Sequence, residues 1–162
     1  MKQTAFAAGT VVSVAKSKAE IEDLLTRYGA DGFAYMQDAA RAAVLFSVLG
    51  RRVRFILPIP AKDEARFTHR KPKASWRSPE KRTELQALAE WDQEHRRLWR
   101  SLALVIKAKL EAVRSGIVTF ENEFLAHMVM PNGPTVGEGI APALLEMHER
   151  GKQLPLLPGG FN

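Results

Sequence analysis

The sequence predicts an α+β domain in which a three- or four-stranded antiparallel meander packs against a long helix and is followed by two shorter C-terminal helices. Three observations predict this fold: three neighbouring segments alternate in hydrophobicity with period two, no proline or glycine occurs between Pro79 and Gly116, and helix-start signals recur after Gly116. With 162 residues, of which 46% are hydrophobic, the chain is expected to form a single domain over residues 1–162.

The first element is predicted to be a helix at about residues 18–28. Ser17 and Glu20 have the spacing of a capping box, and Gly29 is a suitable C-terminal stop. The residues between them form one apolar stripe at i, i+3, i+4 and i+7: Ile21, Leu24, Leu25 and Tyr28. The preceding β-branched run "TVVSVAK" predicts a short strand.

Three strands are predicted next, at residues 32–37, 42–49 and 51–58. Their alternation places one set of side chains on a common buried face: Phe33, Tyr35, Val44, Phe46, Val48, Val53, Phe55 and Leu57. The opposite face then carries Arg52 and Arg54. The connections are short, which favours an antiparallel meander, and its apolar face is expected to be covered by a helix.

The segment at about residues 59–78 is predicted to be a mobile basic connection, because its apolar residues do not recur with the period of a helix or a strand and because it contains Pro72. The long helix is then expected to start at Ser78, Pro79 and Glu80, which fit the N-cap, the first helical position and the first turn. Its apolar stripe runs from Leu85 to Val113 and is denser in the second half. The second half is therefore expected to pack on the sheet, and the first half to project or to contact a partner.

Two shorter helices are predicted at the C-terminal end. Thr119 is expected to cap the first, and "MPNGPT" is typical of a turn. Thr135 and Glu138 have capping-box spacing before a helix that runs to about Arg150, with Pro142 near its start. The tail, at about residues 151–162, is predicted to be extended.

Residues 102–158, "LALVIKAKLEAVRSGIVTFENEFLAHMVMPNGPTVGEGIAPALLE…LPLLPG", together with the upstream "YGA…GRRVRFILPIP", resemble a class of uncharacterised small basic proteins of tailed phages and prophages. The resemblance covers most of the chain. It implies a phage or mobile-element context and carries no activity and no site residues.

The segment 66–82, "RFTHRKPKASWRSPEKR", contains seven Lys or Arg residues and Glu80, so its net charge is 7 − 1 = +6, the same as that of the whole chain. Cations at this density can neutralise phosphates, and an exposed tryptophan among them can stack on unpaired bases. The residues predicted to bind nucleic acid here are Arg66, Arg70, Lys71, Lys73, Trp76 and Arg77. The competing interpretation is a solvated loop in which Phe67 and Trp76 return to the core.

Four further arginines are predicted to contact nucleic acid, namely Arg52 and Arg54 of the sheet and Arg96 and Arg100 of the long helix. Arg96 and Arg100 share a helix face, although nearby acids bring that face close to neutral. The sequence therefore predicts a non-enzymatic, phage-type accessory protein that binds single-stranded or structured nucleic acid in DNA metabolism or recombination.

Two alternatives stay open. A protein-interaction module that inhibits or redirects a host protein would need an exposed apolar patch, for which Leu85, Leu88 and Trp91 are the candidates. A metal-dependent nuclease would need convergent ligands, and the weak candidates are the pairs Glu123 with His127 and Asp63 with Glu64.

Composition and the absence of several motifs argue against other classes of protein function. The chain has no cysteine, which excludes disulfides, zinc–thiolate sites and thiol nucleophiles. The glycine-rich nucleotide motifs and the nucleophile elbow are absent, so no catalytic residue, cofactor or metal is assigned. Gly9, Thr10 and Ser13 interrupt the apolar N-terminal run, and no run reaches the roughly 20 residues of a membrane span. We expect no membrane partner and a cytoplasmic location, in the host cell if the protein is phage-encoded; a homo-oligomer is left open.

Overall fold

The computed structural model describes residues 9–72 and 78–150, and it confirms the α+β prediction. Along the chain its elements are α1 (Val14–Arg27), β1 (Gly32–Gln37), β2 (Arg41–Val48), β3 (Arg51–Pro58), α2 (Ala65–Thr68), β4 (His69–Arg70), β5 (Glu80–Lys81), α3 (Glu84–Arg114), α4 (Phe120–Phe124), the 3-10 helix η1 (Leu125–His127) and α5 (Val136–Arg150).

The three predicted strands form an antiparallel sheet in the order β1-β2-β3. The register places Phe33 opposite Phe46, and Val44 opposite Phe55, so these side chains share one face. Phe46 and Phe55 are buried as predicted, but Phe33 is 42% exposed because it lies on the edge strand, with a sheet neighbour on one side only.

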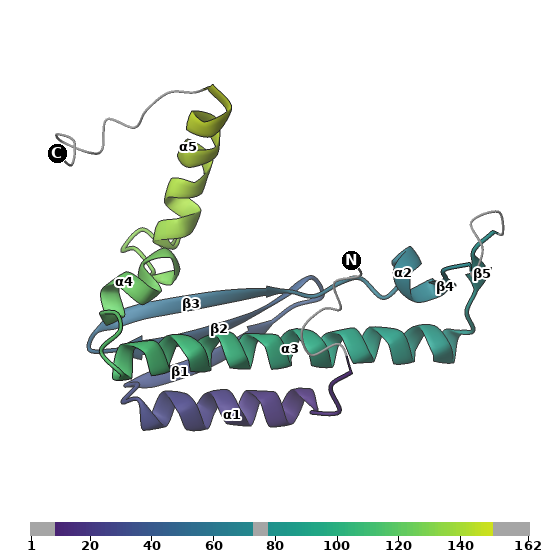
Figure 1. Cartoon of the computed structure of the whole chain (residues 1–162), viewed down its shortest axis with the longest axis horizontal. Coiled ribbons are helices and arrows are strands. Elements are labelled where there is room, and N and C mark those ends of the chain that lie inside the picture. Colours follow the sequence, from purple (N-terminus) through teal and green to yellow (C-terminus); the bar gives the residue numbers. More distant parts are fainter. Residues whose placement is uncertain (1–8, 73–77, 151–162) are drawn as a thin grey trace.

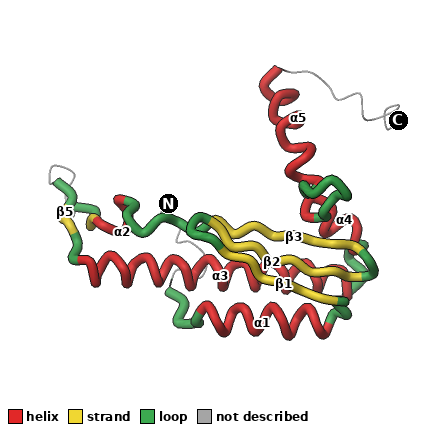
Figure 2. The backbone as a smooth tube through the Cα atoms, turned by 180° about the vertical axis from the view of Figure 1, so that it is seen from behind, coloured by secondary structure: helices red, strands yellow, loops and turns green. Residues whose placement is uncertain are grey.

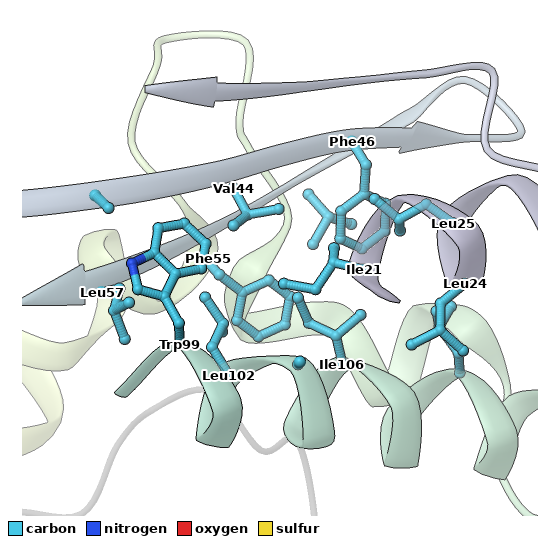
Figure 3. Close-up of a cluster of buried hydrophobic side chains, with 14 of the residues drawn as sticks. Ile21, Leu24, Leu25, Val44, Phe46, Phe55, Leu57, Trp99, Leu102 and Ile106 are labelled. Atoms are coloured by element: carbon cyan, nitrogen blue, oxygen red, sulfur yellow. The ribbon is translucent and has the colours of Figure 1, made fainter. Parts of the chain in front are cut away.

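Helices α1 and α3 lie side by side over this apolar face (Figure 1). Trp99, Leu102 and Ile106 of α3 point toward β2 and β3, and Ile21 and Leu25 of α1 meet the same cluster (Figure 3). The prediction that the second half of the long helix packs on the sheet is confirmed. In the described chain no helix covers the opposite face of the sheet, which we call the open sheet face (Figure 2).

The start of α1 differs from the prediction. Ser13, rather than Ser17, is the N-cap, and its hydroxyl accepts a hydrogen bond from the amide of Lys16 at 3.1 Å. Ser17 is fully buried one turn later. Helical residues from Val14 onward leave no room for the strand predicted over "TVVSVAK".

The long helix also starts later than predicted. Thr83 is its N-cap, and both hydrogen bonds of a capping box with Gln86 are present. Ser78 and Pro79 instead precede the short strand β5, in which Glu80 pairs with Arg70 and Lys81 pairs with His69 of β4. The helix ends where predicted: Gly116 adopts a φ of 71°, and the amide of Ile117 donates to the carbonyl of Ala112.

The connection predicted at about residues 59–78 contains more structure than expected. It includes the helical turn α2 and strand β4, and Phe67 is 4% exposed. The tail predicted at residues 151–162 lies outside the described residues, as do residues 73–77 of the connection.

The C-terminal elements follow the predicted signals. Thr119 caps α4. The turn that contains Gly133 connects Val129 to Thr135, and these two residues pair as an isolated β-bridge. The capping box of α5 is formed, since the Thr135 amide donates to Glu138 at 2.7 Å and the Glu138 amide donates to Thr135 at 3.2 Å. Among the described residues, no helix is both long and apolar enough to cross a membrane.

Candidate nucleic-acid interface

The described residues of the segment 66–82 fold back on the first half of α3, at the end of the molecule far from α5 (Figure 1). The turn α2 packs on α3, and the two-residue strands β4 and β5 pair as an antiparallel ladder. We call α2, β4 and β5, with the described residues between them, the basic hairpin. Phe67 anchors it, because this side chain is buried while the cations around it stay at the surface.

Arg82 holds the basic hairpin together. Its Nη1 donates to the carbonyl oxygens of Arg66, Phe67 and His69 at 3.0, 3.0 and 2.7 Å. Its Nη2 lies 3.4 Å from the carboxylate of Glu90 on α3. The guanidinium N–H donors of Arg82 are thus taken up by backbone carbonyls. Arg82 therefore stabilises the hairpin and is not available to a ligand.

A cavity of about 800 Å³ opens on the basic hairpin. Its described lining contains no carboxylate, and the basic side chains along it are Arg66, His69, Arg70, Lys71 and Arg82. A concave surface with one sign of charge raises the local concentration of an anionic partner. The arrangement is therefore suited to a polyanion.

The cations of this surface differ in how far they are already neutralised. Arg66 lies 2.7 Å from Glu64 and 3.6 Å from Glu94, so its charge is largely compensated. Arg70, Lys71 and Lys81 are exposed and form no ion pair with the described part of the chain. Glu80 stands opposite Arg70 in the β4–β5 ladder, so the uncompensated charge of these four side chains is 3 − 1 = +2.

The predicted sheet arginines lie elsewhere. Arg52 and Arg54 are on the open sheet face, and Arg54 pairs with Glu138 at 2.6 Å. The amide of Thr135 and the Arg54 guanidinium hold the pKa of Glu138 below its usual range. The structure therefore does not bring these two arginines together with the basic hairpin.

The predicted helix arginines are also engaged within the chain. Arg96 donates to the side chain of Gln93 at 2.7 Å, and Arg100 pairs with Glu20 of α1. Both are only partly exposed. Their contribution to nucleic-acid binding stays a prediction, as does that of Lys73, Trp76 and Arg77, which lie outside the described residues.

The aromatic residues near the hairpin are tied to the fold. The Nε1–H of Trp91 donates to the carbonyl of Pro60 at 2.7 Å, and the ammonium of Lys62 lies 4.6 Å from its ring centroid. Trp91 stacks at a tilt on His95, whose Nε2 accepts a hydrogen bond from Trp99 at 3.1 Å. Trp91 is therefore part of the structure that supports the hairpin, and His95 is held between Trp91 and Trp99.

The candidate metal ligands point to other partners. Glu123 accepts a hydrogen bond from Lys109 at 2.9 Å, while the His127 ring stacks on Phe55 at 4.0 Å between centroids. Glu64 accepts hydrogen bonds from the Ala61 amide and from Arg66. Within residues 9–72 and 78–150, no three His, Cys, Asp or Glu residues gather as metal ligands.

Two features of this surface were missed by the sequence analysis. The role of Arg82 has no local signal, because it is one of several cations in a basic run and its acceptors are up to 16 residues away. The β4–β5 ladder is only two residues long and has no alternating pattern. The capping-box spacing of Thr83 and Gln86 was present in the sequence and could have placed the helix start.

No family model, curated protein or solved structure matches the chain significantly.

Proposed function

We propose that the protein binds single-stranded or structured nucleic acid through the basic hairpin, as a non-enzymatic accessory protein of phage type. The observation that carries the proposal is the cavity of about 800 Å³ whose described lining has basic side chains and no carboxylate. Phosphates are the ligands that such a surface attracts, and release of their counterions drives the association.

The rest of the charge distribution supports this location. Outside the hairpin, six arginines form ion pairs with carboxylates of the described chain: Arg41, Arg51, Arg54, Arg97, Arg100 and Arg114. In the hairpin, Arg70, Lys71 and Lys81 keep their charges exposed. Binding of a polyanion there removes no existing ion pair of these three cations within the described residues.

The test is fluorescence anisotropy with a labelled single-stranded oligonucleotide, measured over a series of salt concentrations. The variant is Arg70→Ala/Lys71→Ala/Lys81→Ala. If each cation meets one phosphate, the slope of log affinity against log salt becomes shallower by about 2, at about 0.7 per contact on a single strand. A duplex of the same sequence and a folded hairpin RNA separate the preference for strandedness from simple charge.

A matched control removes the same charge from another surface. Lys16→Ala/Arg27→Ala/Lys107→Ala deletes three exposed cations on α1 and the second half of α3, and is expected to leave the slope close to that of the unchanged protein. Equal effects of the two triple variants would show non-specific attraction by net charge. An unchanged slope in the hairpin variant would contradict the proposal.

A second candidate function is supported by one observation. Leu85 and Leu88, in the first turns of α3, are 81% and 43% exposed beside the basic hairpin. Exposed apolar side chains at the projecting end of a helix are suited to a protein partner, so a module that acts on a host protein is the alternative. Leu85→Asp/Leu88→Asp would then abolish capture of that protein while leaving nucleic-acid affinity unaffected.

A further inference from the structure

The helix α5 has an apolar stripe that the described chain does not cover. Val136, Ile140, Leu144 and Met147 recur along one side, and Ile140 and Leu144 are 42% and 40% exposed. The neighbouring Leu145 is 64% exposed. A helix of 15 residues is marginal in water and is normally stabilised by packing of its apolar side. Within residues 9–72 and 78–150, no element covers this stripe.

The base of α5 is fixed in place. Its capping box is closed between Thr135 and Glu138, and Glu138 is paired with Arg54 of β3. Gly137 approaches η1 so closely that a Cβ at this position would lie 2.8 Å from the carbonyl oxygen of Ala126. The helix is thus held pointing away from the sheet, in both views of the molecule (Figures 1 and 2). Glu138 at the base of α5 borders one groove of the open sheet face, and the rest of the helix extends away from it.

The open sheet face offers a surface of matching chemistry. Two grooves of about 310 and 280 Å³ cross it and share Leu45. Their apolar lining includes Met36, Ala43 and Ile56, and Met36 and Ile56 are 63% and 43% exposed. A sheet whose second face carries large apolar side chains is normally covered by a helix or by another sheet.

The charges of the two surfaces are complementary. From Val136 to Arg150 the sequence contains three glutamates and one arginine, a net charge of −2. The described lining of the two grooves carries Arg41, Arg52 and Arg54 against Asp38 and Glu138, a net charge of 3 − 2 = +1. Glu138 belongs to α5 of the same chain and is already paired with Arg54, so without this pair the face has a charge of +1 and α5 a charge of −1.

We propose that α5 of one copy lies in the grooves of the open sheet face of a second copy, and that the second copy returns the same contact. A reciprocal exchange of this kind is isologous, so it closes as a two-fold dimer and leaves neither the stripe nor the face uncovered. It also explains why the orientation of α5 is fixed by tight contacts at its base.

The test measures the mass of the full chain in solution by sedimentation and light scattering, over a wide range of concentration and after nuclease treatment. We expect a dimer for the unchanged protein. Leu144→Glu on α5 and Ile56→Glu on the open sheet face should each give a folded monomer. The matched control Leu85→Glu introduces the same charge at an exposed leucine at the opposite end of the molecule, and should remain a dimer because Leu85 lies outside both surfaces.

Mixing the two single variants separates this exchange from other dimers. The Ile56→Glu chain retains an intact α5, and the Leu144→Glu chain retains an intact open sheet face, so the mixture should form a heterodimer with one of the two contacts. Formation of the heterodimer would also show that both variants are folded. A monomeric unchanged protein, a mass that falls after nuclease treatment, a dimeric Ile56→Glu chain or a mixture that stays monomeric would each overturn the proposal.

Discussion

Ile106 lies at the centre of the core, between the sheet and α1, and is fully buried. Replacement by alanine removes buried methyl groups and leaves a cavity, so Ile106→Ala should lower the free energy of unfolding by about 2–5 kcal/mol. Leu85→Ala, on the same helix at 81% exposure, should change it by less than about 0.5 kcal/mol. Chemical denaturation of both variants checks the contrast. Similar values for both would mean that α3 does not pack as described.

Two half-buried histidines make the stability depend on pH. Burial, followed by the charge of Lys18, lowers the pKa of His95; burial, followed by the charge of Lys109, lowers the pKa of His127. Each histidine therefore binds a proton more readily in the unfolded chain, and acid favours unfolding. The free energy of unfolding should be at its full value above pH 6.5 and fall as the pH drops below 6.5 toward the lowered values.

This decline can be assigned by substitution. His95→Gln/His127→Gln should flatten the profile between about pH 7.5 and 5, because glutamine does not titrate there while the carboxylates with lowered pKa titrate at lower pH. Urea denaturation at several pH values gives the profile. A double variant that loses stability toward pH 5 as steeply as the unchanged protein would place the titrating group elsewhere.

At the scale of elements, the start of α3 is the clearest case for a test. Thr83→Ala removes the acceptor for the Gln86 amide and should lower the free energy of unfolding by about 1 kcal/mol. Ser78→Ala, at the position that the sequence suggested, should have almost no effect because Ser78 lies before β5 and is exposed. If Ser78→Ala is the costlier change in denaturation experiments, the helix begins where the sequence analysis placed it.

The two glycines in the first turn of α5 should respond in opposite ways to alanine. At Gly137 the new Cβ would meet the backbone oxygen of Ala126, so Gly137→Ala should cost about 1–3 kcal/mol and weaken the attachment of α5. At Gly139 it would meet only the flexible end of Met130, and the gain in helix propensity of about 0.5–1 kcal/mol can offset that contact. Thermal melting of the pair, with Gly139→Ala as the control, tests this. Equal losses would mean that the close approach at Gly137 does not fix the helix.

These element boundaries also explain what could be predicted from sequence. The strands were predicted nearly to the residue because large apolar side chains of β2 and β3 recur with period two on the buried face. The stop of α3 at Gly116 and the capping box at Thr135 are likewise local signals. Ser13 and Ser17 are both residue types that cap helices, and the choice between them depends on tertiary packing, because Ser17 is fully buried within α1.

At the scale of the whole molecule, the candidate site was predicted only in part. The concentration of charge in residues 66–82 is a matter of composition, so the location of the basic hairpin could be read from it. The sequence could not show which of these cations remain available to a ligand, because Arg66 and Arg82 are compensated by Glu94 and Glu90 from a different element. The open sheet face and the projection of α5 depend on tertiary arrangement and have no counterpart in the local pattern.

The length of α3 has a consequence for local motion. At 1.5 Å per residue its 31 residues span about 46 Å, whereas the eight residues of β2 span about 27 Å, so the helix extends well beyond the sheet. Its buried residues begin only at Trp99. Amide hydrogen exchange should therefore follow a gradient along one unbroken helix, fast by local opening near Ala87 and slow by global unfolding near Ile106. A ligand on the basic hairpin would slow exchange in the first half alone, and the second half would keep the rate that the core sets.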